Sequence, residues 1–191
     1  MGKIAFVFPG QGAQVGGMGQ NVYENSAVAK DVFEQASKAV DLDLKALCFE
    51  ENNDINITEF TQVCLLTTSV AIMEELKTRG VKADVAAGLS LGEYCALVAA
   101  GSMNFVDAAK AVRKRGIFMQ EVPAGKGGMA AILGMDAAEI DKNIEEFDKV
   151  QVANYNCPGQ IVISGETEQV KQAADKLKEA GAKRAVVLNV S

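Results

Sequence analysis

The chain of 191 residues contains no histidine. Histidine is the usual general base for a serine or cysteine nucleophile, and it is also a frequent metal ligand. Its absence excludes histidine-ligated metal sites and leaves any nucleophile in this chain without its usual base. A catalytic interpretation of the sequence has to account for that gap.

The sequence also lacks an excess of basic residues and any long apolar run. Its 19 Lys and Arg residues stand against 25 Asp and Glu residues, for a net charge of −6. An acidic chain is a poor ligand for phosphate backbones, so nucleic acid is not expected as the main partner. The first apolar run, Ile4 to Phe8, is too short for a membrane span or a signal peptide. We therefore expect a cytoplasmic protein that starts at Met1.

Close cysteine pairs are absent as well. The four cysteines are scattered along the chain and form no C-x-x-C motif: Cys48, Cys64, Cys95 and Cys157. Outside an oxidising compartment such residues are usually buried, reduced thiols. The sequence therefore predicts neither a disulfide framework nor a metal site.

The first part of the chain alternates strand-like and helix-like segments. At 49% hydrophobic and 23% charged residues the composition is that of a folded globule. Alternation of this kind favours a parallel sheet with helices on both faces, and the continuous apolar run 4–8 predicts a strand buried on both faces. The predicted strands are 4–8 and 85–89, and the predicted helices are 26–40, 62–79, 91–101 and 105–121.

The composition changes at 123–128, a Gly-rich stretch that we interpret as a flexible joint. The segments beyond it follow a βαββαβ order, which is that of a ferredoxin-like unit. They are strand 129–133, helix 137–147, strands 150–154 and 161–164, helix 167–180 and strand 185–190. We therefore expect a large subdomain at 1–125 and a small one at 126–191. The large one shows only two strands, too few to cover its helices, and is expected to be incomplete.

A G-x-S-x-G motif, Gly88 to Gly92, lies between a predicted strand and a predicted helix. This is the context of a nucleophile elbow, in which the serine occupies a strained turn between two glycines. A chain of this composition would contain about 0.06 such motifs by chance. Ser90 is therefore a candidate nucleophile, with the N–H of Leu91 facing the developing oxyanion. The alternative is a Gly-rich turn with an inert serine.

The segment Pro9 to Gln14 follows the first strand. It lacks the third glycine of a dinucleotide-binding fingerprint, because Val15 stands there, and no Gly-Lys-Ser/Thr sequence supports a P-loop. Two interpretations remain. The segment is either a plain tight turn or a loop that offers a second oxyanion donor at Gln11.

Arg115 falls on an apolar sector of the predicted helix 105–121, whereas Arg113 and Lys114 point elsewhere and can be solvated. A guanidinium in that position requires an anion, which could be a substrate carboxylate or an internal carboxylate. Position alone does not distinguish the two. Met119 shares this face, where a methionine is more often a core residue.

Five segments together resemble malonyl-CoA:acyl-carrier-protein transacylase, with the acyltransferase domains of polyketide synthases as relatives. They are FVFPGQGAQ (6–14), GLSLGEYCALVAAG (88–101), RKRGIFMQE (113–121), GGMAAI (127–132) and NYNCPGQIVISG (154–165).

The resemblance implies an α/β hydrolase-like large subdomain with an inserted ferredoxin-like small subdomain. It implies that Ser90 takes a malonyl group from coenzyme A and passes it to the phosphopantetheine thiol of acyl carrier protein, in fatty-acid biosynthesis. Gln11 and Leu91 would supply the oxyanion hole. Arg115 would bind the malonyl carboxylate, with Met119 as a further substrate-binding candidate. No permanently bound cofactor is implied, and the coenzyme A thioester is a substrate.

The chain departs from the family pattern in two places. Leu89 stands where the family usually has a histidine before the nucleophile, and we expect this to alter local packing only. The family's catalytic histidine would follow the last predicted strand, where this chain ends. We therefore expect the N-terminal part of the enzyme, poorly active without a complementing C-terminal segment.

Two other functions remain open. A Ser–Asp hydrolase of the patatin kind needs no histidine, but its aspartate normally lies in an Asp-Gly dipeptide, which this sequence lacks. A non-catalytic domain that binds the carrier protein is the other possibility. The chain's negative charge disfavours binding to that acidic carrier.

Overall fold

The structure is a computed structural model that describes residues 2–50, 52–121 and 125–188. The chain divides into two compact units, residues 1–120 and 121–191. The sequence placed the boundary between the two subdomains a few residues later, and part of the predicted joint lies outside the described residues.

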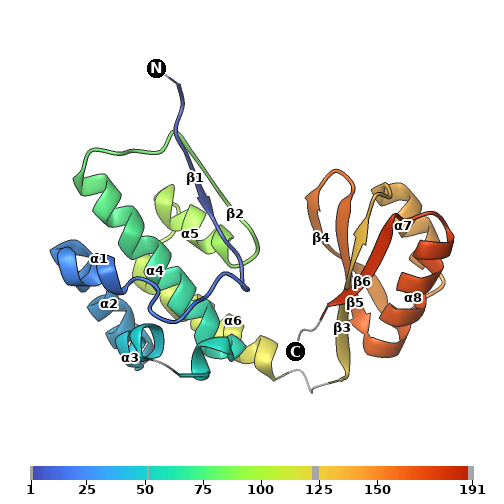
Figure 1. Ribbon diagram of the computed structural model, residues 1–191, viewed down its shortest axis with the longest axis horizontal. Helices are drawn as coiled ribbons and strands as arrows, with labels where there is room; N and C mark the ends of the chain where they lie inside the picture. Colours follow the sequence, from blue (N-terminus) through green and yellow to red (C-terminus); the bar gives the residue numbers. More distant parts are fainter. Residues whose placement is uncertain (1, 51, 122–124, 189–191) are drawn as a thin grey trace. The chain divides into compact units, whose positions relative to one another are not determined.

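The first unit is built from a small parallel sheet and several helices (Figure 1). The segments that the sequence predicts as strands and as longer helices do form strands and helices, with their ends shifted by at most four residues. The apolar pattern of the sequence does not predict the helices α1, α3 and η1, because they are too short to show a full apolar period. The elements are β1 (Ala5–Phe8), α1 (Gln20–Asn25), α2 (Ala27–Val40), α3 (Leu44–Phe49), the 3-10 helix η1 (Asp54–Asn56), α4 (Thr58–Thr78), β2 (Val85–Gly88), α5 (Gly92–Ala99) and α6 (Phe105–Gln120).

Strands β1 and β2 pair in parallel, from Ala5 opposite Val85 to Phe8 opposite Gly88. The face that carries Phe8 is buried, and α5 packs against both strands. The other face is open: the side chain of Val7 is 74% exposed and that of Val85 is 54% exposed. The prediction of a strand buried on both faces is therefore wrong. An apolar run shows which residues can be buried, but the described part of the chain supplies no element that covers this face.

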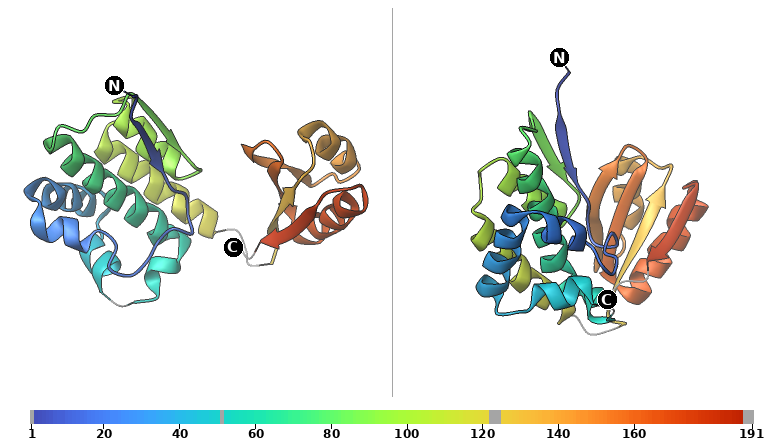
Figure 2. Two further views of the ribbon diagram at one scale, coloured as in Figure 1. Left: turned by 45° about the horizontal axis from the view of Figure 1, so that its top comes forward. Right: turned by 60° about the vertical axis from the view of Figure 1, so that its left-hand side comes forward.

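The core of the first unit surrounds α4, which packs between α2 and α6. Figure 2 shows this long helix between its neighbours. Along most of its length α4 is buried on all sides, so its composition is apolar without a clear amphipathic period. Its N-terminal turn, Thr58 to Thr61, was missed because the polar residues there resemble a loop. The largest fully buried side chains include Phe33, Leu44, Leu66, Met73 and Leu91.

The second unit is a four-stranded antiparallel sheet with the strand order β4-β5-β3-β6. Helices α7 and α8 lie on one face of the sheet (Figures 1 and 2). The core between these layers contains Ile132, Ile140, Ile163 and Leu177. This order confirms the predicted ferredoxin-like unit. Its elements are β3 (Gly127–Leu133), α7 (Ala137–Ile144), β4 (Val150–Cys157), β5 (Gln160–Glu166), α8 (Thr167–Glu179) and β6 (Arg184–Leu188).

The four cysteines are free thiols, of which Cys48, Cys64 and Cys95 are buried as predicted. Cys157, in contrast, is exposed at the end of β4. In the part of the chain that the structure describes, no helix is long and apolar enough to cross a membrane.

Candidate active site

Ser90 lies in the sharp turn between the end of β2 and the start of α5. Its φ angle is 51°, a left-handed conformation that is costly for a residue other than glycine. Its side chain is exposed. The fold therefore keeps the serine in a strained turn and presents it to solvent, which is the geometry of a nucleophile elbow.

The two glycines of the motif are required by close backbone packing. A Cβ atom on Gly88 would lie 1.9 Å from the carbonyl carbon and oxygen of Gly92. A Cβ atom on Gly92 would lie 2.3 Å from the carbonyl oxygen of Phe8 in β1. Neither position can accept a side chain, so the glycines allow β1, the turn and α5 to meet at Ser90.

Arg115, on α6, reaches the same turn from another side of the unit. Its Nη2 donates a hydrogen bond to Oγ of Ser90 at a distance of 3.0 Å. Its guanidinium also lies over the ring of Tyr94, 5.9 Å from the centroid. Among the described residues no carboxylate pairs with Arg115 in an ion pair. The positive charge thus remains available to an anion beside Ser90.

Arg113, which the helical pattern places where it can be solvated, is instead largely buried and hydrogen-bonded. Its Nη1 donates to the backbone carbonyl of Glu59 at 2.9 Å and to the carboxylate of the same residue at 2.8 Å. Its guanidinium also lies over the ring of Phe60. The prediction failed because α4 packs along this side of α6, and a helical pattern does not show which sides will be covered.

The loop after β1 lies against the elbow. A Cβ atom on Gly10 would come within 2.8 Å of the carbonyl oxygen of Leu89, so the two loops are in contact. Among the residues that the structure describes, neither the N–H of Gln11 nor that of Leu91 donates a hydrogen bond to the protein. Leu91 is also the N-cap residue of α5, and the N-terminal end of a helix carries a partial positive charge. Both N–H groups are therefore free to stabilise an anion.

Gln62, which the sequence analysis missed, joins these elements. Its side chain is fully buried, and its Oε1 accepts a hydrogen bond from Nη1 of Arg115. Its Nε2 donates to Oε1 of Gln11 and to Sδ of Met119, each at 3.1 Å. The sequence contains one indication of this role: Gln62 begins an apolar stretch and is followed directly by Val63, Cys64 and Leu65.

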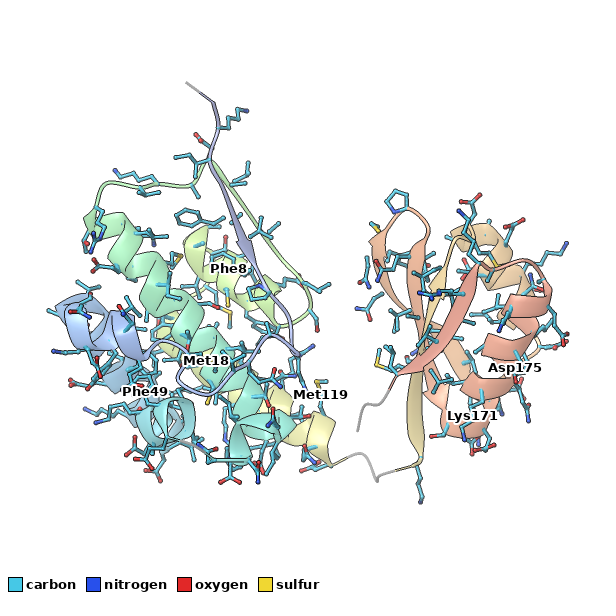
Figure 3. All side chains as sticks on the ribbon, in the orientation of Figure 1. Phe8, Met18, Phe49, Met119, Lys171 and Asp175 are labelled. Atoms are coloured by element: carbon cyan, nitrogen blue, oxygen red, sulfur yellow. The ribbon has the colours of Figure 1, made fainter. Side chains whose placement is uncertain are left out.

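Met119 belongs to this cluster through its sulfur atom. Figure 3 shows it near the C-terminal end of α6. Its side chain is 38% exposed, so the expectation of a core residue is wrong. The helix ends one residue later, and this last turn extends past the packed core.

Leu89, the residue before the nucleophile, is 52% exposed. Its N–H donates to the carbonyl oxygen of Phe8 at 3.1 Å, which holds the elbow to β1 through the backbone. The side chain itself makes none of the polar contacts at Ser90.

In the described residues, no group of three His, Cys, Asp or Glu side chains could hold a metal ion.

Comparison with known proteins gives a consistent result. Residues 5–191 match the acyl transferase domain family. The malonyl CoA-acyl carrier protein transacylase of Bacillus subtilis is 53% identical over 197 residues, and that of Escherichia coli is 47% identical. All of this chain is covered in both cases, but only 62% and 64% of the two relatives. The chain thus spans less than two thirds of their length.

Solved structures give the same picture. The malonyl CoA-acyl carrier protein transacylase of Clostridium perfringens superimposes with a TM-score of 0.92 at 47% identity, over all of this chain and 61% of that one. A malonyl-transacylase solved in complex with its type II polyketide synthase acyl-carrier protein superimposes with a TM-score of 0.89 at 44% identity. That match covers all of this chain and 63% of that one.

Proposed function

The chain belongs to the acyl transferase domain family, and on this basis we propose that it is the nucleophile-bearing part of a malonyl-CoA:acyl-carrier-protein transacylase. The observation that carries the proposal is the position of Ser90 in a strained elbow beside the guanidinium of Arg115. The reaction would serve fatty-acid synthesis or a related pathway in the cytoplasm.

In the first half-reaction, Oγ of Ser90 attacks the thioester carbonyl of malonyl-CoA and loses its proton to a base. The tetrahedral intermediate then expels the coenzyme A thiolate, which leaves as the thiol once it is protonated, and malonyl-Ser90 remains. In the second half-reaction, the phosphopantetheine thiol of the carrier protein attacks this ester and restores Ser90. The N–H groups of Gln11 and Leu91 stabilise the oxyanion in both halves.

Arg115 selects acyl groups that carry a carboxylate. A guanidinium has five N–H donors, of which one is bonded to Ser90 and one to Gln62. Those that remain suit the two oxygens of a carboxylate, which accept a pair of parallel hydrogen bonds. Because the same guanidinium bonds Ser90, a malonyl group held by it has its thioester carbonyl near the nucleophile.

The chain has no histidine, and among the described residues only Arg115 bonds Oγ of Ser90, so the usual base for the serine is not among its partners. We propose that a segment equivalent to the remainder of the longer relatives supplies it. The open face of the β1–β2 sheet supports this, as does an apolar groove of about 340 Å³ beside β1 and α4 that includes Val7, Ile72 and Leu76. Without that segment the chain should be poorly active.

The two alternatives fit the site less well. A Ser–Asp hydrolase needs a carboxylate that activates the serine, whereas the group that bonds Ser90 is a cation. A non-catalytic carrier-binding domain has no need for a strained and exposed serine between two sterically required glycines.

The test is the intact mass of the chain after incubation with malonyl-CoA. The chain is measured alone and with the part of the Bacillus subtilis relative that lies beyond the matched region, with Ser90→Ala as control. A malonyl adduct that requires the added segment and is absent from Ser90→Ala supports the proposal. A folded complex without an adduct would overturn it.

A further inference from the structure

The polar contacts of Gln62 all involve residues of the candidate site. The side chain is fully buried on α4, which packs between α2 and α6. A buried amide is costly unless both its ends are hydrogen-bonded. Its partners here are Arg115 at one end and Gln11 and Met119 at the other.

The orientation of this amide follows from the chemistry of its partners. A guanidinium has donors only, so the group of Gln62 that faces Arg115 must be the carbonyl oxygen. The NH₂ group then points to Oε1 of Gln11 and to Sδ of Met119. The amide of Gln11 is fixed in turn, because the NH₂ group of Gln62 needs its Oε1 as an acceptor, and Nε2 of Gln11 then donates to Oγ1 of Thr58 at 3.1 Å. Each group can therefore adopt a single orientation.

We propose that Gln62 is a positioning residue that connects the carboxylate-binding arginine to the oxyanion-hole loop. It acts through Arg115 and Gln11 and does not touch the substrate. The inference rests on the proposed function and extends it: one buried amide sets the distance between the site for the acyl carboxylate and the site for the thioester oxygen.

Loss of Gln62 removes an acceptor from Arg115 and a donor from Gln11 together. The guanidinium then keeps its bond to Ser90 and its contact with Tyr94, neither of which fixes its rotation about the side chain. Because a misplacement of about 1 Å can reduce a rate by about 10²-fold, the effect should be largest for substrates that need the arginine. An acyl group without a carboxylate should be affected much less.

The first measurement needs no catalysis. The full chain is treated with phenylglyoxal, and modification of Arg115 is followed by peptide mass spectrometry. Gln62→Met keeps the length of the side chain and removes its polar ends, so Arg115 should react several times faster than in wild type. Gln62→Glu keeps an acceptor for Arg115 and should react as slowly as wild type.

Thr61→Val is the matched control. Thr61 is fully buried on the same helix, and within the described part of the chain its hydroxyl bonds only the backbone carbonyls of Ile55 and Ile57. It should lower thermal stability without changing the reactivity of Arg115. Equal reactivity in Gln62→Met, Thr61→Val and wild type would overturn the proposal. If Gln62→Met does not fold, fast modification of Arg115 in folded Gln62→Glu would also overturn the proposal.

The second measurement is made on the chain combined with the complementing segment. In Gln62→Met, kcat/KM for malonyl-CoA should fall about 10- to 100-fold, and that for acetyl-CoA less than about threefold. An equal loss for both substrates would show a general structural defect and contradict the proposal. Failure of the proposed function is distinct: wild type itself would then form no adduct at Ser90.

Discussion

Nη2 of Arg115 donates a hydrogen bond to Oγ of Ser90 across 3.0 Å, although Ser90 lies in the turn before α5 and Arg115 lies within α6, 25 positions later. A guanidinium can only donate, so the serine oxygen acts as the acceptor in this pair. The hydroxyl hydrogen of Ser90 is therefore free to face a base. The same contact places the candidate carboxylate site beside the nucleophile.

Replacing Arg115 should change which acyl group reacts. In Arg115→Met, malonyl transfer by the complemented chain should fall by about 10²-fold or more, because a desolvated carboxylate loses its charge-assisted partner. Transfer of an uncharged acetyl group should fall far less. Competition between malonyl-CoA and acetyl-CoA, read as the two adduct masses, measures this preference. Lys114→Met, an exposed neighbour on α6, is the control; an unchanged preference in Arg115→Met would contradict the assignment.

The strain at Ser90 should be measurable as stability. Ser90→Gly removes the nucleophile and also relieves the left-handed conformation, whereas Ser90→Ala removes the nucleophile and keeps the strain. We expect the glycine variant to have a free energy of unfolding about 1 kcal/mol higher than that of the alanine variant. Urea denaturation of the two chains provides the measurement. Equal stabilities would mean that the turn is not strained by its side chain.

The elbow should not tolerate a side chain at Gly88. In Gly88→Ala the new Cβ would overlap the backbone of Gly92, and we expect a loss of more than about 3 kcal/mol or no folded protein. Gly16→Ala is the matched control, since a Cβ there meets nothing within 4 Å. The two variants are compared by their soluble yield and by the urea concentration at the midpoint of unfolding. A stable Gly88→Ala chain would show that β2 and α5 can separate without loss of the fold.

The cysteines should differ in reactivity. Burial raises the pKa of the Cys95 thiol to about 11, and a side-chain hydrogen bond with Cys48 together with burial raises the pKa of the Cys64 thiol as well. A raised pKa means less thiolate at pH 8, so both thiols should react slowly with a disulfide reagent, whereas exposed Cys157 should react at once. The change Cys157→Ser should remove the fast phase of the reaction with the disulfide reagent. A fast phase that persists would show that the first unit opens readily.

The fold could be predicted largely from apolar patterns, because most elements are either long helices or strands with apolar runs. Helix α8 buries one face, which leaves a clear helical period in the sequence, and β5 carries the buried apolar run Ile161 to Ile163. The first unit was harder. Its short helices α1 and α3 leave no full period, and the uncovered face of β1 follows from what packs there, which the run Ile4 to Phe8 does not encode.

The site was predictable where one residue type is required by geometry. Gly88 and Gly92 can be recognised in the sequence because the turn tolerates no side chain at either position, and they mark Ser90 between them. Gln62 could not be found in this way. A glutamine on a helix has many uses, and the role of this one depends on three partners brought together from the loop after β1 and from α6. Arg113 illustrates the same limit, since its acceptor on α4 is 54 residues away.

The open β1–β2 face gives a test of complementation. Val7 is 74% exposed and contributes to the groove beside β1, so Val7→Asp should change the stability of the isolated chain by less than about 0.5 kcal/mol. A segment that packs on this face would have to bury the carboxylate, which costs several kcal/mol without a partner. Adduct formation at Ser90 should therefore be lost in the mixture, although the chain stays folded. Val28→Asp serves as the control, because it introduces the same charge in the first turn of α2, where the helix dipole favours it. If Val7→Asp is complemented as well as Val28→Asp, the segment binds elsewhere and the groove has another occupant.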